Sequence, residues 1–471
     1  MNIFENDTIA AISTAMTNAG IGIIRVSGEN AIEVVDKVYV NKYKKRKLKE
    51  YLTHTIHYGY IIDDATVVDE VMVSIMKAPN SFTMEDTVEI NCHGGVLVMK
   101  KILALVVGSG ARLAEPGEFS KRAFLNGRID LSKAEAIMEL IHAKNEMSLK
   151  TSISHLSGSI YELIIKLRAD ILYEIAFIES ALDDPEHVSL EGYYDSLSAK
   201  LTEVKSNLSK LEDSFKYGRI IKEGIQTAII GRPNVGKSSL LNYMAGTQRA
   251  IVTDIAGTTR DTIEQEINID GIHLNMIDTA GIRNTDDIIE KIGVEKSKEY
   301  IKEADLVVYM IDASCEIGDD DYEIMENIKD SKTIVLLNKS DLESIVDEHL
   351  IADTYKKVNG ADIPKDIFII EVSVKEERGF SEFRSAIKTL FMEDKIRFNE
   401  EVAITNLRQY ELIKDAIEAL KMVEGSIADD MPEDFISIDL MSAYSALGFI
   451  IGEEVSDDVV NEIFGKFCTG K

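Results

Sequence analysis

The chain has 471 residues, of which 45% are hydrophobic, 28% are charged and only 6 are proline. At about 100 to 200 residues per domain, this length predicts several domains, and the composition excludes a disordered or collagen-like chain. The formal charge of −30 repels a polyanion over most of the surface, so any nucleic acid must bind through local basic patches.

The cysteines and the apolar runs bear on the cellular compartment. Cys92, Cys315 and Cys468 lie far apart without a CxxC pair, which indicates neither a disulfide framework nor a zinc knuckle. The uncharged run 8–24 is interrupted by polar residues and follows two acidic ones, so it has the pattern of neither a signal peptide nor a membrane span. We therefore expect a cytoplasmic protein with no membrane partner.

The first part of the chain, residues 1–122, mixes short β-rich runs such as 22–26 and 71–75 with helix-like stretches. This alternation predicts an α+β module. From about 130 to 217, apolar residues recur at steps of three and four, which predicts long amphipathic helices. These apolar positions are Ile153, Leu156, Ile160, Ile164, Leu167, Ile171, Ile175, Ile178 and Leu182.

Near Ile225 the pattern changes to short apolar runs separated by helical patterns, which predicts a mainly parallel sheet. The runs are 225–230, 306–311, 333–337 and 367–372. Beyond about 395 the helical period returns, so an α/β domain is inserted between two helical segments that can pack together. We expect a multidomain α/β and α protein whose domains are 1–122, 123–222, 223–392 and 393–471.

A phosphate-binding motif opens the inserted domain. The segment 231–238 satisfies GxxxxGK[ST] directly after the run that ends at Ile230, and a helix-forming run follows it. Its glycines allow backbone N–H groups to surround a β-phosphate, Lys237 supplies a cation, and the Ser238 hydroxyl can bind Mg²⁺. An ordinary tight turn is the alternative, and the motifs downstream argue against it.

Four further motifs follow in the order typical of a GTPase. Asp278 begins Asp-Thr-Ala-Gly, which offers a carboxylate for the metal, and Thr259 is the expected second Mg²⁺ hydroxyl. Asp341 ends Asn-Lys-Ser-Asp, and its carboxylate can accept from a donor pair that guanine has and adenine lacks. The loop 373–375 completes the base side. The predicted GTP-binding residues are Asn234, Val235, Gly236, Lys237, Ser238, Ser239, Thr253, Asp254, Ile255, Ala256, Gly257, Thr258, Thr259, Asp278, Thr279, Ala280, Gly281, Asn338, Lys339, Asp341, Ser373, Val374 and Lys375.

Blocks outside these motifs resemble the MnmE (TrmE) family of tRNA-modification GTPases, over essentially the whole chain. Generic GTPases share only the nucleotide motifs, so the additional blocks make the resemblance specific. The blocks are 7–12, 22–28, 80–83, Glu89, 93–95, 116–127, 254–261 and 467–471.

The resemblance implies a Ras-like GTPase domain, a folate-fold N-terminal domain and a constitutive homodimer. It also implies a partner, MnmG (GidA), that carries FAD and joins a heterotetramer or larger complex. Together they would place an aminomethyl or carboxymethylaminomethyl group on the wobble uridine, position 34, of certain tRNAs. The carbon would come from 5-formyl- or methylene-tetrahydrofolate, held by Arg25, Glu89, Arg128 and Lys471. Arg128 stands where lysine is common, which preserves charge but changes donor geometry.

Hydrolysis in the family depends on potassium, which pairs two GTPase domains. By resemblance, the potassium ligands are Asn234, Thr253, Ile255 and Thr258. The residue after the Asp278 motif is Ile282, where many signalling GTPases carry a water-orienting glutamine, and the resemblance assigns that role to Glu290.

Other positions keep two interpretations. Cys468 is implied to be catalytic or to line the site, and an ordinary tail residue is the alternative. The basic run 42–47 either contacts tRNA phosphate or is a solvated loop. Three residues depart from the family pattern, namely Met84 where glycine is usual, Val374 where alanine is usual, and Thr469. The rival functions are a ribosome-assembly GTPase and a nucleotide-controlled scaffold.

Overall fold

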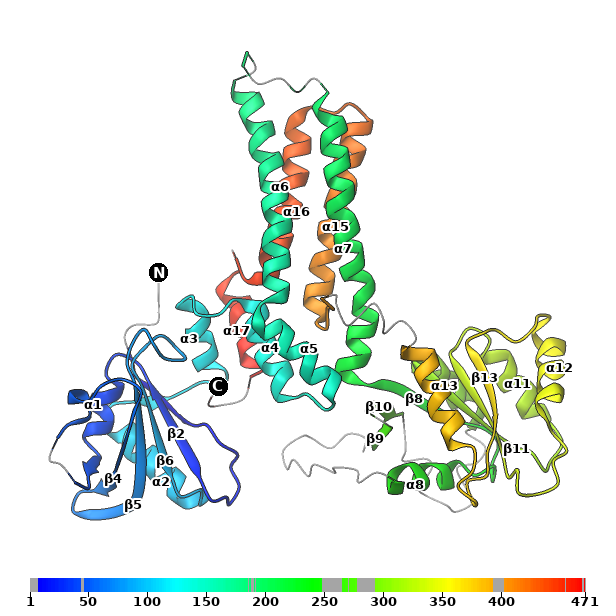
Figure 1. Ribbon diagram of the computed structural model, residues 1–471, viewed down its shortest axis with the longest axis horizontal. Helices are drawn as coiled ribbons and strands as arrows, with labels where there is room; N and C mark the ends of the chain where they lie inside the picture. Colours follow the sequence, from blue (N-terminus) through cyan, green and yellow to red (C-terminus); the bar gives the residue numbers. More distant parts are fainter. Residues whose placement is uncertain are drawn as a thin grey trace. The chain divides into compact units, whose positions relative to one another are not determined.

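The computed structural model describes residues 7–43, 46–184, 186–187, 190, 192–247, 265–269, 271–277, 293–392, 402–453, 455–467 and 470 (Figure 1). The chain forms two compact units. Unit 1 joins Met1–Ile141, His155–Leu201 and Glu418–Lys471, and unit 2 joins His142–Ser154 and Thr202–Ile417. Each unit therefore combines segments that are far apart in the sequence.

Unit 1 contains a seven-stranded sheet with the order β3-β4-β5-β6-β2-β1-β7, antiparallel except for the pair β1 and β7. Its strands are β1 (Ile9–Ile12), β2 (Gly22–Ser27), β3 (Tyr39–Asn41), β4 (Thr55–Asp63), β5 (Thr66–Met76), β6 (Thr87–Cys92) and β7 (Arg112–Leu113). Helices α1 (Ala31–Asp36) and α2 (Val96–Gly108) cover one face, since Val35, Met99 and Ile102 are buried against Ile24 and Ile90. The 3₁₀ helix η1 (Leu48–Glu50) and α3 (Glu118–Leu125) complete this region.

Long helices account for the period of three and four. They are α4 (Leu131–Ile141), α5 (Glu146–Ser157), α6 (Ser159–Asp183), α7 (Tyr193–Glu223), α15 (Leu407–Ala428), α16 (Glu433–Ile451) and α17 (Asp457–Gly465). On α6 the predicted positions from Ile160 to Ile178 are buried, and α6 runs beside α16 (Figure 1). Ile153 and Leu182, by contrast, are 51% and 39% exposed, so the sequence period extends beyond the buried stripe at both ends.

Of the helices in the described part of the chain, α16 alone is long and apolar enough to span a membrane. Half of its most apolar stretch is buried. Ser437 on α16 hydrogen-bonds to Glu179 on α6, and α16 also packs against α4. These contacts are those of a core helix.

Unit 2 contains a six-stranded sheet with the order β13-β12-β11-β8-β10-β9, parallel except for the β9–β10 pair. The strands are β8 (Ile225–Ile230), β9 (Gln265–Ile269), β10 (Ile272–Met276), β11 (Leu306–Asp312), β12 (Thr333–Asn338) and β13 (Ile367–Glu371). All four predicted apolar runs are strands here. The parallel order brings their carboxyl ends to one edge of the sheet, where the sequence motifs follow.

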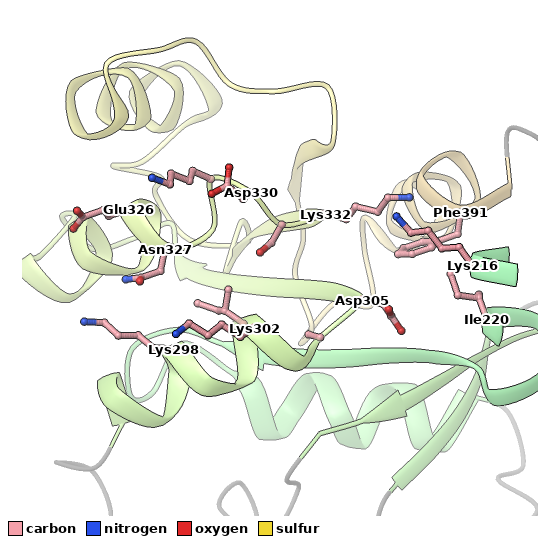
Figure 2. Close-up of a pocket in the computed structure, with 14 residues that line it drawn as sticks. Lys216, Ile220, Lys298, Lys302, Asp305, Glu326, Asn327, Asp330, Lys332 and Phe391 are labelled. Carbon is pink, nitrogen blue, oxygen red and sulfur yellow. The ribbon is translucent and has the colours of Figure 1, made fainter. Parts of the chain in front are cut away.

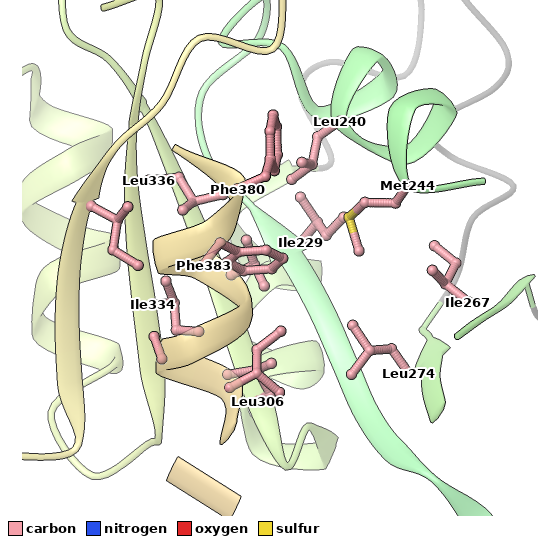
Figure 3. Packing of buried hydrophobic residues seen from close by; sticks show 14 of the residues in the cluster. Ile229, Leu240, Met244, Ile267, Leu274, Leu306, Ile334, Leu336, Phe380 and Phe383 are labelled. Carbon is pink, nitrogen blue, oxygen red and sulfur yellow. The ribbon is translucent and has the colours of Figure 1, made fainter. Parts of the chain in front are cut away.

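Helices bury both faces of this sheet, which is why its strands are continuous apolar runs. On one face α8 (Lys237–Thr247) and α13 (Phe380–Met392) pack through Leu240, Met244, Phe380 and Phe383 (Figure 3). On the other lie α10 (Gly293–Glu303), α11 (Asp319–Asn327) and α12 (Glu348–Asn359). The predicted fold class, multidomain α/β and α with a mainly parallel GTPase sheet, is confirmed.

Candidate functional site

The phosphate loop connects β8 to α8. Gly231 and Gly236 have φ of 142° and 107°, and Asn234 has φ of 64°. A Cβ at Gly231 would lie 2.3 Å from the Met310 carbonyl oxygen, and one at Gly236 would lie 2.4 Å from Asn338 Nδ2. Both glycines are therefore required by backbone angle and by close approach. The loop has the shape that the motif predicts.

Three predicted phosphate ligands stand at the start of α8. Lys237 Nζ donates to the carbonyls of Gly231 and Arg232 at 2.7 and 2.8 Å, so its ammonium lies over the loop. Ser238 and Ser239 follow in the first turn of the helix. A helix N-terminus presents unpaired N–H groups and a partial positive charge, which suits a phosphate.

Asn338, the last residue of β12, joins the phosphate side to the base side. Its Nδ2 donates to the Val235 carbonyl at 2.7 Å, and its Oδ1 accepts from the Val374 N–H at 3.2 Å. The side chain is buried. One amide thus fixes two loops that the sequence separates by more than 100 residues. Valine at 374 leaves this bond intact because it is made by the backbone.

Asp341 and Ser373 form the base-side pair. Ser373 Oγ donates to Asp341 Oδ1 at 2.7 Å, and Lys375 Nζ lies 3.7 Å from Asp341 Oδ2. The hydrogen bond from Ser373 lowers the pKa of Asp341 below its usual value, with help from the charges of Lys375 and Arg378. The carboxylate is therefore ionised at neutral pH and able to accept hydrogen bonds from a base.

Lys339 has a partner that the sequence interpretation missed. Its Nζ lies 2.6 Å from Asp312 Oδ2, at the carboxyl end of β11. Burial opposes ionisation of Asp312, but hydrogen bonds from Lys339 and Ser314 hold its pKa below the usual value. A carboxylate at the carboxyl edge of a parallel strand was the signal that could have identified it.

The remaining nucleotide and metal predictions lie outside the described residues, as does the proposed water-orienting residue. They are Thr253, Asp254, Ile255, Ala256, Gly257, Thr258, Thr259, Asp278, Thr279, Ala280, Gly281 and Glu290. Cys468 and Lys471 lie outside them too.

A second cluster lies on the sheet face of unit 1 that α1 and α2 leave open. Arg25 Nε donates to Glu89 Oε1 at 2.9 Å across the β2–β6 pair. The Arg25 guanidinium also lies 5.7 Å from the centre of the Phe82 ring, and that of Arg128 lies 4.9 Å from it. Three predicted folate residues are therefore brought together around one aromatic ring.

Gly470, near the C-terminus, contacts the Arg25 cluster. Arg25 Nη1 donates to the Gly470 carbonyl at 3.4 Å, and Ser13 Oγ donates to it at 3.0 Å. Gly470 has φ of 97°, and a Cβ there would lie 2.5 Å from the Ile12 carbonyl oxygen. Glycine is thus needed where the tail passes over β1, one residue before the predicted folate ligand Lys471.

A buried ion-pair network supports this cluster. The Arg122 side chain is only 6% exposed and lies 2.5 Å from Asp7, 3.0 Å from Glu118 and 3.1 Å from Glu85. Ser27 Oγ donates to Glu85 at 2.8 Å, so the network fixes the segment that carries Phe82. Sequence reasoning placed Asp7, Ser27, Glu118 and Arg122 in family blocks without giving them a role, and Glu85 lies outside those blocks.

A separate depression of about 690 Å³ lies at the amino edge of β11 and β12, opposite the nucleotide motifs (Figure 2). Lysines line it, including Lys302, Lys329 and Lys332. Lys332 Nζ donates to the Leu390 carbonyl in the last turn of α13 at 2.5 Å. Lysines at helix C-termini stabilise the terminal carbonyls and the negative end of the dipole, so we interpret this group as structural.

Two family models together match most of the chain. Residues 8–128 match the family model for the GTP-binding protein TrmE N-terminus, and residues 131–468 match the model for the MnmE helical domain. Among solved structures, the FeoB G domain from Methanococcus jannaschii is 22% identical over 36% of this chain and 98% of its own, with a TM-score of 0.25, which is too weak a likeness to support an argument.

Curated relatives match over the full length. The tRNA modification GTPase MnmE of Lachnoclostridium phytofermentans is 52% identical over 99% of this chain and 100% of its own. The proteins of the same description from Clostridioides difficile and Bacillus pumilus are 44% and 43% identical, over 100% and 99% of this chain and 100% of each relative. The chain therefore belongs to the MnmE family of tRNA modification GTPases.

Proposed function

We propose that this GTPase modifies tRNA. With the FAD-carrying partner MnmG, it forms the 5-aminomethyl or 5-carboxymethylaminomethyl group on the wobble uridine of certain tRNAs, using a one-carbon unit from tetrahydrofolate. The full-length relatives are tRNA modification GTPases, which supports tRNA as the substrate. The observation that carries the folate chemistry is the gathering of Arg25, Glu89 and Arg128 around Phe82.

These residues fit a reduced folate. Glu89 is an acceptor for ring N–H groups, Phe82 offers an apolar face to a flat heterocycle, and two guanidinium groups suit the acidic tail. Lys471 follows Gly470, which touches Arg25, so its charge would join theirs. Bound tetrahydrofolate would supply the one-carbon unit. The chain's own residues bind and orient it.

At the nucleotide site, Lys237 and the loop N–H groups would hold the phosphates, while Asp341 would select guanine. Ser238 and Thr259 would hold Mg²⁺. Asn234, Thr253, Ile255 and Thr258 would hold K⁺, and pairing of two GTPase domains through it would drive hydrolysis. Support comes from Asn234, which stands in the phosphate loop with a left-handed backbone and whose side-chain amide oxygen can act as a ligand.

The open sheet face also supports the homodimer. Ile56, Tyr58 and Met72 are 67%, 37% and 46% exposed on adjacent strands, and cross-strand pairing puts Ile56 in the same row as Glu89 and Arg25. An apolar group of this kind on a polar surface indicates a protein contact. We propose that a second copy covers it, and that the complex with MnmG and tRNA works in the cytoplasm.

The test measures folate binding and tRNA chemistry separately. By calorimetry, Arg25→Ala and removal of Lys471 should each weaken 5-formyltetrahydrofolate binding and leave GTP affinity unchanged. Mass spectrometry of tRNA nucleosides should show loss of the wobble modification in a deletion strain. Normal folate affinity in both variants rejects the folate site, and retained modification in the deletion strain favours a ribosome-assembly or scaffold role.

A further inference from the structure

Lys144 and Asn145, which connect α4 to α5, contact the hairpin formed by β9 and β10. Lys144 Nζ forms an ion pair with Glu266 on β9. The Lys144 carbonyl accepts a hydrogen bond of 2.9 Å from His273 Nε2 on β10. A single residue from outside the GTPase sheet therefore binds both strands of the hairpin.

Asn145 makes a second set of contacts. Its Oδ1 accepts from the Ser148 N–H at 2.7 Å, which caps the start of α5. Its Nδ2 donates to the Ile221 carbonyl in the last turn of α7 at 3.1 Å. The same amide thus joins α5 to the helix that leads into β8.

The end of α7 also lies directly against β10. Asn275 Nδ2 donates to the Glu223 carbonyl at 2.5 Å. Gly224 has φ of 90°, and a Cβ there would lie 3.0 Å from the His273 carbonyl oxygen. Glycine is needed for this approach. The hairpin, α7 and the 144–145 connection therefore meet in one joint.

Some polar atoms in the joint have no hydrogen-bond partner. Within the described part of the chain, His273 Nδ1 and Asn275 Oδ1 are buried without a hydrogen-bond partner. Buried unpaired acceptors are unfavourable for folding, and apolar residues of similar shape avoid that cost. The joint therefore keeps polar side chains where apolar ones would be more favourable for stability.

The hairpin lies at one edge of the sheet, and Ile267, Ile272, Leu274 and Met276 anchor it in the hydrophobic core. β9 is the edge strand, and β10 pairs with β8 through residues 274–276 and through the Ile277 N–H, which donates to the Thr227 carbonyl at 3.0 Å. Along the chain, β9 begins soon after Thr259, and β10 ends just before Asp278. The segment that contains Thr259 therefore leads into the hairpin, and the segment that contains Asp278 leads out of it.

We propose that Lys144 and Asn145 are positioning residues for GTP hydrolysis, acting through the β9–β10 hairpin. The inference rests on the GTPase activity of the family and not on folate or tRNA chemistry, so it can fail while the proposed function stands.

Two substitutions remove the side-chain contacts of Lys144 and Asn145, and the bond from His273 to the Lys144 backbone carbonyl remains. Lys144→Ala removes the ion pair, and Asn145→Asp keeps the acceptor that caps α5 but loses the donor to Ile221. In the full-length protein, the double variant Lys144→Ala/Asn145→Asp should hydrolyse bound GTP about fivefold more slowly in single turnover, an effect typical of residues that couple sites. Its GTP affinity should change by less than about twofold. Lys144→Arg alone keeps a cation for Glu266 and should hydrolyse GTP at the wild-type rate.

The matched control is Lys356→Ala. It removes an exposed ion pair, in which Lys356 Nζ lies 2.9 Å from Asp362 Oδ1. This pair is in the same unit as the hairpin but is not in contact with it. This variant should hydrolyse GTP at the wild-type rate. The proposal is overturned if the double variant hydrolyses normally, if its GTP affinity falls as much as its rate, or if the control loses as much activity.

Discussion

At the scale of single residues, we expect Asp341 to determine base selectivity. Its carboxylate is oriented by Ser373 and ionised at neutral pH. Asp341→Asn should abolish the preference for GTP and favour xanthosine triphosphate, since an amide presents a donor where guanine also has donors. A mismatch of this kind costs on the order of 10⁴-fold in discrimination. A binding titration with both nucleotides checks it, with Asp347→Asn at the α12 cap as the control that keeps GTP preference. A variant that still prefers GTP contradicts the assignment.

The backbone conformation of Met84 is unfavourable for a residue with a side chain. Its φ of 61° is left-handed, a conformation in which glycine is favoured and a side chain costs about 1 kcal/mol. By the resemblance, glycine is usual at this position, and methionine in the left-handed conformation is strained. Met84→Gly should raise the free energy of unfolding by about 0.5 kcal/mol in urea titration, because the relief of strain is offset in part by the greater unfolded-state entropy of glycine. Met84→Ala, which keeps a Cβ, should bring no gain, and an equal gain from alanine would refute the strain.

At the scale of elements, the sequence predicts strands and helices well because their periods are local. The four apolar runs became β8, β11, β12 and β13, and the stripe from Ile160 to Ile178 became the buried face of α6. The pairing of Asp7 with Arg122, or of Lys339 with Asp312, could not be predicted, because it depends on how distant elements pack. Phi angles such as that of Met84 are likewise set by the packed chain.

The network around α3 should make unit 1 sensitive to acid. Burial raises the pKa of Glu118, but hydrogen bonds from Arg112, the Glu115 N–H and Arg122 outweigh it and hold this pKa below the usual 4.5. A lowered carboxylate pKa stabilises the fold above the unfolded value, and this stability is lost as pH falls through the folded value. The free energy that Glu118→Gln removes should therefore be largest near neutral pH and shrink below about pH 4.5. Urea unfolding across pH checks it, and a pH-independent difference would contradict the ion-pair origin.

At the scale of the whole molecule, the order of the nucleotide motifs was enough to predict a GTPase, and the blocks outside these motifs were enough to predict its family. The convergence of Val235, Asn338 and Val374 follows from the parallel sheet, whose strands end at one edge. The joint at Lys144 could not be predicted, because nothing in the sequence near that residue marks a contact with a strand more than 120 positions away.

Hydrolysis itself should depend on the size of the monovalent cation. Ile282 replaces the glutamine that orients water in many GTPases, and Asn234 stands in the phosphate loop with a left-handed backbone. A potassium ion held there would supply positive charge near the phosphates and order the loop for pairing across the dimer. Sodium is smaller and would draw the same oxygens into a poorer shell, so KCl should accelerate single-turnover hydrolysis and NaCl should not. Glu290→Ala should lose roughly 10² to 10⁴-fold in rate with GTP affinity nearly unchanged, the range for a positioned acid or base. Equal rates in the two salts would refute the potassium model, and a fully active Glu290→Ala would make that residue an ordinary surface glutamate.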